Sequence, residues 1–330
     1  MSEGLKGFLQ THPSLKYVFF GGKGGVGKTA FAGATALYLA EHGRKVLLAS
    51  TNPVHSLSGL LKQDVFGKET QVAGTPLIAI EIDTKETILK KKQEIKGKIE
   101  WFLKYADLSG QKTEDFVESA TMNPAFEESA MFERMVDLMF ENRYDVYVFD
   151  TAPTANARRL LGMSKVYGLW VEKMLASRNE AATLAKTLSF TKKEEKDPLL
   201  DYLLEFRDRI DRVHKLLTDE RLTSFFFVTL PEALPIAVIK RFIGWFKDFG
   251  IPVGGVIVNG LIQIPSPLEG EGKGEGVPLH EFVRNRIASQ ERYMEDIRSS
   301  FPHVRAVVPR LEHEIQGVDR IRETFQYLFA

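Results

Sequence analysis

A glycine- and lysine-rich stretch near the N-terminus constrains this chain more than any other feature. Residues 22–29 read GKGGVGKT and fit the pattern G-x-x-x-x-G-K-[ST]. An apolar run at 16–20 (KYVFF) precedes the stretch, and an alanine-rich segment at 29–41 follows it. In a strand, glycine loop and helix of this order, backbone N–H groups and a helix N-terminus surround phosphate oxygens. The sequence therefore predicts that this loop binds a nucleotide.

Each kind of residue in the loop has an expected role. The glycines let successive backbone N–H groups turn toward a triphosphate, Lys28 neutralises the outer phosphates, and the Thr29 hydroxyl is placed to ligate Mg²⁺. The predicted nucleotide-binding positions of this stretch are Gly22, Lys23, Gly24, Gly25, Val26, Gly27, Lys28, Thr29 and Ala30.

Composition excludes several classes of protein. The 330 residues contain 44 basic and 44 acidic side chains, so the chain has no net charge that would attract nucleic acid, and no nucleic-acid partner is expected. There is no cysteine, which excludes disulfides, cysteine-bound zinc and thiol catalysis and fits a cytoplasmic protein. The first 16 residues lack the apolar core of a signal peptide, and no run of 18 apolar residues occurs. We therefore expect at most peripheral contact with a membrane.

Short apolar, β-branched runs alternate with helical patterns along the chain, which is typical of a parallel sheet covered on both faces. We predict an α/β fold of the P-loop NTPase class with a mostly parallel sheet. The predicted strands are residues 16–21, 46–50, 77–82, 146–150, 224–230, 255–259 and 305–308. Ligands of such sheets lie beyond the carboxyl ends of the strands, so the residues that follow each run are the candidates for function.

We expect a single domain over residues 1–330 with two helical insertions, at 85–142 and 158–221, because neither stretch shows a strand pattern. The first insertion begins with a lysine-rich segment that is typical of an amphipathic helix with one solvated face. Six of the eight methionines lie between Met122 and Met174. Methionine-rich surfaces can repack around varied apolar partners, although core packing accounts more simply for any single methionine.

Two segments near the C-terminus are assigned by composition and spacing. Residues 263–279 (QIPSPLEGEGKGEGVPL) are rich in glycine, proline and glutamate and predict a flexible surface loop. Residues 311–328 carry apolar side chains at helical spacing and predict a closing amphipathic helix docked on the core.

Two further segments lie where the outer phosphates of a nucleotide are expected. Residues 146–150 (VYVFD) are four apolar residues that end in a carboxylate, which predicts that Asp150 reaches Mg²⁺. Residues 50–57 (STNPVHSL) follow another strand, and there Asn52 could orient an attacking water but could not accept its proton. His55 is either a loop histidine or a side chain that senses phosphate.

Lys23 makes the glycine loop a deviant Walker A of the K-G-G-V-G-K-T type. With this loop, the chain resembles the ArsA/Get-type ATPases, which drive arsenite pumps or deliver tail-anchored membrane proteins. The resemblance covers most of the chain. Residues 51–57 (TNPVHSL) are similar to the first switch of the family, T-D-P-A-H-S-L, and residues 150–154 (DTAPT) are similar to its second switch. The other matching segments are 228–232 (VTLPE), Asn259 as the adenine-reading asparagine, and Pro309 with Arg310 in the adenine-side loop.

The resemblance implies a homodimer that closes around two ATP molecules with Mg²⁺. Lys28 would bind phosphates in its own subunit, and Lys23 would act catalytically by crossing to the nucleotide of the partner. Closing would shape a groove for a hydrophobic client or a membrane-protein partner.

The chain departs from the family pattern in four places. Asn52 replaces the aspartate that activates water, which implies slow hydrolysis or an isosteric replacement that traps ATP. Residues 155–157 are ANA where the family has G-H-T, there is no CxxC for interfacial zinc, and there is no cysteine to capture arsenite. The leading hypothesis is an ATP-dependent targeting factor. The alternatives are a subunit that drives an arsenite or anion pump and a nucleotide-gated binding module with little hydrolysis.

Overall fold

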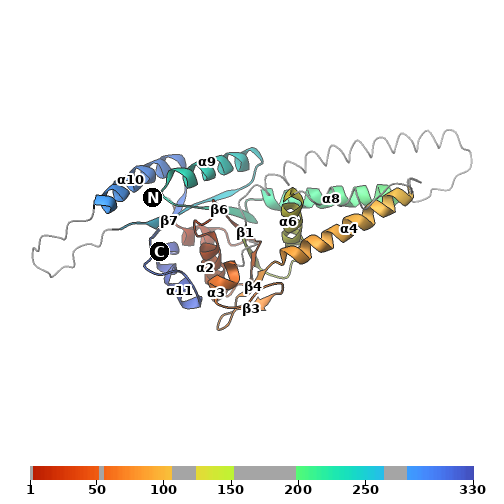
Figure 1. The fold of residues 1–330 in the computed structure, drawn as a ribbon, viewed down its shortest axis with the longest axis horizontal. Helices are drawn as coiled ribbons and strands as arrows, with labels where there is room; N and C mark the ends of the chain where they lie inside the picture. The colour runs from red at the N-terminus through yellow and green to blue at the C-terminus, as the bar shows by residue number, and fades with distance from the viewer. Residues whose placement is uncertain (1–2, 52–55, 106–123, 152–197, 264–280) are drawn as a thin grey trace, which may run out of the picture. The chain divides into compact units, whose positions relative to one another are not determined.

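The computed structural model describes residues 3–51, 56–105, 124–151, 198–263 and 281–330. Its central feature is an eight-stranded sheet with the order β3-β4-β2-β5-β1-β6-β7-β8 (Figure 1). All neighbouring pairs are parallel except β3 and β4. The strands are β1 (Tyr17–Gly21), β2 (Val46–Ser50), β3 (Thr70–Gln71), β4 (Ile78–Glu81), β5 (Val146–Asp150), β6 (Thr223–Thr229), β7 (Val253–Leu261) and β8 (Val304–Pro309).

This sheet confirms the predicted α/β fold of the P-loop class. Seven of its strands coincide with the seven predicted runs, with ends that differ by up to two residues. The short edge strand β3 was not predicted, because two polar residues give no apolar run to recognise.

Helices cover both faces of the sheet. On one face lie α2 (Lys28–Glu41) and α11 (Val318–Glu323), and on the other lie α9 (Ala233–Asp248) and α10 (Glu281–Ser300) (Figure 1). Alternate strand residues serve the two faces: Val18 and Phe20 belong to the core beneath α2, whereas Phe225 and Phe227 contact Phe246 of α9. The short helices on the sheet are α1 (Leu5–Thr11), α3 (Ser56–Leu61) and α12 (Phe325–Leu328).

The prediction of one closing helix over residues 311–328 was wrong. The structure has only the short helices α11 and α12 in this range, and residues 311–317 form no helix. Gly317 adopts a φ of +85°, and its N–H donates to the carbonyl of Leu60 at 2.7 Å. This contact turns the chain before α11 begins, so the apolar positions ahead of it, such as Ile315, pack from an extended segment.

The chain divides into two compact units. The sheet unit comprises residues 1–82, 142–154 and 220–330, and the helical unit comprises residues 83–141 and 155–219. The predicted loop at 263–279 lies, apart from Gln263, outside the described residues. Among the described helices, none combines the length and hydropathy that a membrane-spanning segment needs.

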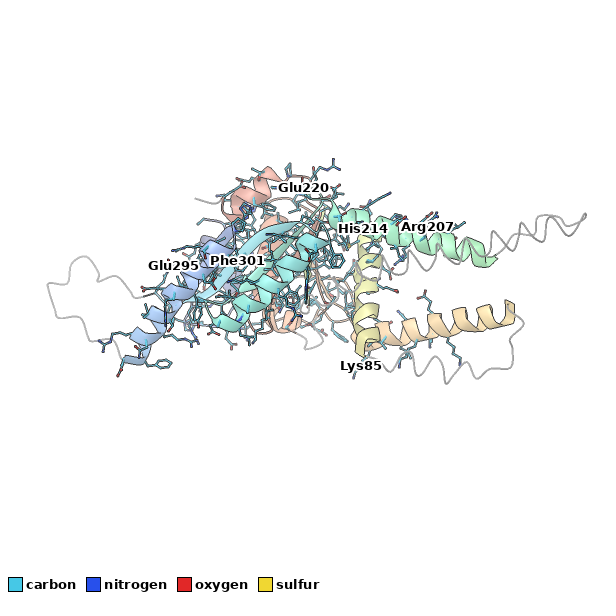
Figure 2. All side chains as sticks on the ribbon, turned by 90° about the horizontal axis from the view of Figure 1, so that it is seen from above. Lys85, Arg207, His214, Glu220, Glu295 and Phe301 are labelled. Atoms are coloured by element: carbon cyan, nitrogen blue, oxygen red, sulfur yellow. The ribbon has the colours of Figure 1, made fainter. Side chains whose placement is uncertain are left out.

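The described part of the helical unit consists of α4 (Thr84–Tyr105), α6 (Pro124–Glu141) and α8 (Pro198–Thr218). Lys85 lies at the start of α4, and Arg207 and His214 lie along α8 (Figure 2). Helices α6 and α8 are joined by an ion pair between Arg209 and Asp137, with 2.5 Å between Nη2 and Oδ1. The three methionines of α6, namely Met131, Met135 and Met139, are buried. Met122, Met163 and Met174 lie outside the described residues.

Candidate nucleotide site

The loop between β1 and α2 requires glycine at two points for steric reasons. Gly22 has a φ of +140°, and a Cβ there would lie 2.3 Å from the carbonyl oxygen of Val228. Gly27 has a φ of +100°, and a Cβ there would lie 2.6 Å from Nδ2 of Asn259. Gly25 also has a positive φ, +78°, but Gly24 and Gly25 are both exposed, with open space around them. The two glycines at the ends thus fix the path of the loop, and the middle of the loop faces outward.

The loop and the start of α2 bring positively charged groups together. Helix α2 starts at Lys28, and its N-cap is Gly27, which has no side chain to satisfy the first N–H groups. The Lys28 side chain is buried, and its Nζ donates to the carbonyl of Lys23 at 3.1 Å. Burial lowers the pKa of Lys28, although the nearby Asp150 opposes this shift. A desolvated ammonium and free helix amides together fit the phosphate groups of a nucleotide.

Asp150 lies at the end of β5 with its two carboxylate oxygens in different surroundings. Oδ2 accepts hydrogen bonds from the Thr29 hydroxyl at 2.7 Å and from the Ser50 hydroxyl at 3.1 Å. Oδ1 is buried and has no hydrogen-bond partner among the described residues. Burial raises the pKa of Asp150, against the opposing effects of Thr29, Lys28 and Ser50. An unpaired carboxylate oxygen beside a threonine hydroxyl fits a divalent cation such as Mg²⁺.

No cluster of three or more histidine, aspartate or glutamate side chains suited to a metal occurs in the described part of the chain. Mg²⁺ at a nucleotide takes one or two protein ligands and completes its shell with phosphate oxygens and water. The predicted metal ligands Thr29 and Asp150 are therefore brought together, from α2 and β5.

Asn52, the predicted catalytic residue, lies outside the described residues, as does His55. The residues on either side of this gap are well defined. Thr51 is buried, and its N–H donates to the carbonyl of Asp150 at 3.1 Å. The Ser56 hydroxyl lies 3.4 Å from that of Thr29. The segment that carries Asn52 therefore starts and ends beside Asp150 and Thr29.

A cavity of about 360 Å³ lies in the sheet unit next to the loop. Gly25, Asn259, Arg310, Gln290 and Tyr293 are among its lining residues, so it brings two of the three predicted adenine-side residues to one place. Pro309 does not line the cavity; it ends β8, where it pairs with Leu261 of β7. The volume suits the base and sugar of a nucleotide whose phosphates lie in the loop.

Asn259 has a second contact that its place in the sequence did not predict. Its Nδ2 donates to the carbonyl of Val26 at 2.9 Å, which ties β7 to the glycine loop. A Cβ at Gly27 would collide with this same nitrogen, so glycine at this position allows the contact of Asn259 with the loop. Asn259 is thus placed to link the cavity with the phosphate loop.

Sequence reasoning missed several residues of the site. Ser50 and Glu81 are buried polar residues at the ends of β2 and β4, and Gln290 is a buried amide on α10. The run at 77–82 (LIAIEI) held a usable signal, because a carboxylate near the carboxyl end of an apolar strand resembles the pattern that identified Asp150. Gln290 offered none, since one glutamine on a polar helix is unremarkable in sequence.

Comparison with known proteins agrees with this geometry. The family profile described as "Anion-transporting ATPase" matches residues 15–330, which is nearly the whole chain. The chain belongs to the anion-transporting ATPase family. Its named relatives in this family are ATPases, and this chain is an ATPase of the same P-loop class.

Three relatives illustrate the range of similarity. The "Putative arsenical pump-driving ATPase 2" of Aquifex aeolicus is 30% identical over 317 residues, which cover 95% of this chain and 99% of the relative. The "ATPase ASNA1 homolog 2" of Paramecium tetraurelia is 27% identical over 338 residues, covering 99% and 97%. The "ATPase GET3A" of Arabidopsis thaliana is 29% identical over 318 residues, covering 94% and 82%.

Proposed function

We propose that this ATPase works as a homodimer that closes around two ATP molecules and couples closing to the binding of a hydrophobic client. The observation that carries the proposal is the second loop lysine. Lys23 is half-buried, and within the described residues its ammonium has no hydrogen bond or ion pair, whereas Lys28 is turned onto the loop. A lysine without a partner in its own subunit is available to the phosphates of a second subunit.

The remaining site residues have separate roles in this proposal. Lys28 and the amides of residues 22–30 hold the phosphates, Thr29 and Asp150 hold Mg²⁺, and Asn259, Pro309 and Arg310 form the base side. When bound, Mg²⁺ neutralises charge on the phosphates that react. Asn52 orients water without accepting its proton, so hydrolysis is slow. The similarity to full-length ATPases of this family supports these assignments.

Client binding is assigned to the helical unit. Its methionines Met131, Met135 and Met139 are buried in this structure, so a client surface would form only when the helices rearrange between nucleotide states. We propose a client with an apolar segment, of the tail-anchored type, or a membrane protein as partner. The cysteine-free composition favours action in the cytoplasm.

Two alternative functions remain distinct from this one. The name of the Aquifex relative favours an ATPase that drives an arsenical pump. This chain has no cysteine, so arsenite could not activate it through thiolate ligands. The other alternative is a nucleotide-gated binding module, in which Asn52 makes ATP a ligand that is held and seldom hydrolysed.

Substitution of the two loop lysines separates binding from dimer closure. We expect Lys28→Ala to weaken ATP binding by at least about tenfold, because a charge-assisted contact to phosphate is lost. The matched control Lys23→Ala should bind ATP to the isolated subunit with unchanged affinity. Calorimetric titration with ATP and Mg²⁺ measures both values, and equal affinities for wild type and Lys28→Ala would contradict the site.

Asn52→Asp tests the account of slow hydrolysis. We expect single-turnover hydrolysis to rise by about 10²-fold or more, because a carboxylate can accept the proton of the attacking water. ATP affinity should stay the same, since the phosphate contacts are untouched. Equal hydrolysis rates for the two proteins would remove any special role of this position.

A further inference from the structure

Glu81 is a buried carboxylate at the edge of the nucleotide site, and none of the roles assigned above belongs to it. It ends β4, with 1% of its surface exposed. Its register partner in β2 is Ser50, which is also the register partner of Asp150 in β5. Directly paired residues of parallel strands present their side chains to the same face of the sheet. Glu81, Ser50 and Asp150 therefore form one polar row at the carboxyl edge of the sheet.

The Glu81 side chain holds the beginning of α3. Oε1 accepts a hydrogen bond from the N–H of Leu57 at 3.1 Å. Oε2 accepts from the Ser58 hydroxyl at 2.7 Å and from the Ser58 N–H at 3.4 Å. The first N–H groups of a helix have no partner within the helix, and a negative charge there also suits the helix dipole. Glu81 is thus the anchor of this helix start.

This anchor defines one end of the segment that carries Asn52. The other end is Thr51, whose N–H donates to the carbonyl of Asp150. Ser56 is the first residue of α3 and lies 3.4 Å, between hydroxyl oxygens, from Thr29. Since Glu81 fixes α3, it also fixes Ser56 against the proposed Mg²⁺ ligand Thr29.

We propose that Glu81 is a positioning residue of the nucleotide site, which holds the start of α3 with Ser56 beside Thr29 and thereby sets the preference of the protein for ATP over ADP. The proposal rests on the proposed function, in which Thr29 and Asp150 hold the Mg²⁺ that contacts the outer phosphates. The structural basis is that one carboxylate accepts hydrogen bonds from three donors at the helix start. An amide at this position would present N–H groups to one of those donors, so the anchor needs the carboxylate.

The test compares Glu81→Gln with Ser58→Ala, which removes only the hydroxyl donor, and with the control Glu69→Gln. Glu69 is a carboxylate of the same unit that binds Arg143 and Tyr144 and makes none of the contacts to α3. Calorimetry gives the affinity for a non-hydrolysable ATP analogue and for ADP, each with Mg²⁺. Hydrogen exchange gives the protection of the Leu57 and Ser58 amides in the nucleotide-free protein.

We expect Glu81→Gln to lose at least about tenfold in affinity for the ATP analogue, because charge-assisted hydrogen bonds are lost, with ADP affinity within about twofold of wild type. The Leu57 and Ser58 amides should exchange faster. Ser58→Ala should shift both readouts in the same direction by a smaller factor, and it decides the matter if Glu81→Gln does not fold. Glu69→Gln should lower thermal stability and leave the ratio of ATP-analogue to ADP affinity unchanged.

An unchanged affinity ratio or unchanged amide protection in Glu81→Gln would overturn the inference. These failures differ from a failure of the proposed function. If wild type bound no nucleotide, the proposed function would be lost and exchange at Leu57 and Ser58 would still decide whether Glu81 anchors α3. If wild type bound both nucleotides equally, the role of Glu81 in the preference for ATP would be lost.

Discussion

Asp150 and Lys28 are ionisable residues that are buried in the folded protein. One oxygen of Asp150 is buried without a hydrogen bond among the described residues. Burial raises the pKa of Asp150 and lowers that of Lys28, and both shifts favour the neutral form of the side chain. Such groups cost stability until a partner arrives. Their placement at a phosphate loop accounts for the cost, because phosphate and Mg²⁺ supply the missing charges.

Tyr17 gives a prediction about alkaline pH. Burial raises its pKa to about 12, and the neighbouring Tyr147 acts in the same direction. A group whose pKa is raised on folding stabilises the protein fully below its unfolded pKa of about 10, and this contribution is lost as pH rises toward about 12. We expect the free energy of unfolding of wild type to fall in this window by at most about 1.4 kcal/mol per pH unit from this residue.

Tyr17→Phe is the matched variant, since it keeps the ring and removes the ionising group. Urea unfolding at pH values between about 9 and 12 should show a shallower loss of stability for the variant. Parallel curves for the two proteins would contradict the assignment of this loss to Tyr17.

The residues that sequence reasoning identified and those that it missed differ in how they make contacts. Lys28, Thr29 and Asp150 belong to a continuous pattern in which spacing alone fixes the chemistry. Ser50 and Glu81 act across the sheet, through pairs with residues far away in the chain. Only strand order and register reveal such pairs, and one sequence contains neither.

Among the elements, α10 is tied to the cavity by the side chain of Gln290. The amide of Gln290 donates to the carbonyl of Ile262 at 2.9 Å and accepts from its N–H at 2.7 Å, as a neighbouring strand would. A second link is the ion pair of Arg286 with Glu232, with 2.6 Å between Nη2 and Oε1, whose side chains are 48% and 41% exposed. Exposed pairs contribute little, so the buried amide is the stronger link.

Gln290→Ala should therefore destabilise the protein by about 1–2 kcal/mol, because two half-buried backbone groups of Ile262 lose their hydrogen-bond partners. Gln290→Glu keeps an acceptor for the Ile262 N–H but loses the donor to its carbonyl, and we expect a similar or greater loss. Chemical denaturation measures both. A change of less than about 0.5 kcal/mol in Gln290→Ala would show that α10 is held by other contacts.

The prediction of one helix over residues 311–328 was an error about a secondary-structure element. Apolar spacing there met the criterion for a helix, yet Gly317 and its bond to Leu60 turn the chain, and the residues before it line the cavity. A tertiary contact thus overrode a local pattern. Strands 16–21, 46–50 and 146–150 were predicted well because they are buried on both faces and read as continuous apolar runs.

The proposed function of the whole molecule involves a nucleotide site in the sheet unit and a helical unit that has its own internal contacts. Within the helical unit, Arg209 and Arg212 lie over the ring of Phe140. Helix packings that include polar and cation–π contacts beside apolar ones can have more than one stable arrangement. ATP would bias such an exchange only if it binds one arrangement more tightly than the other.

In the proposed function, ATP closes two copies of this chain around the site, and Lys23 reaches the nucleotide of the partner. The most direct measurement is the mass of the protein by light scattering at micromolar concentration with ATP and Mg²⁺, with ADP and Mg²⁺, and without nucleotide. We predict a dimer mass with ATP and Mg²⁺ for wild type and a loss of this ATP-dependent dimer in Lys23→Ala. A wild-type protein that binds ATP and still scatters as a monomer would contradict the account.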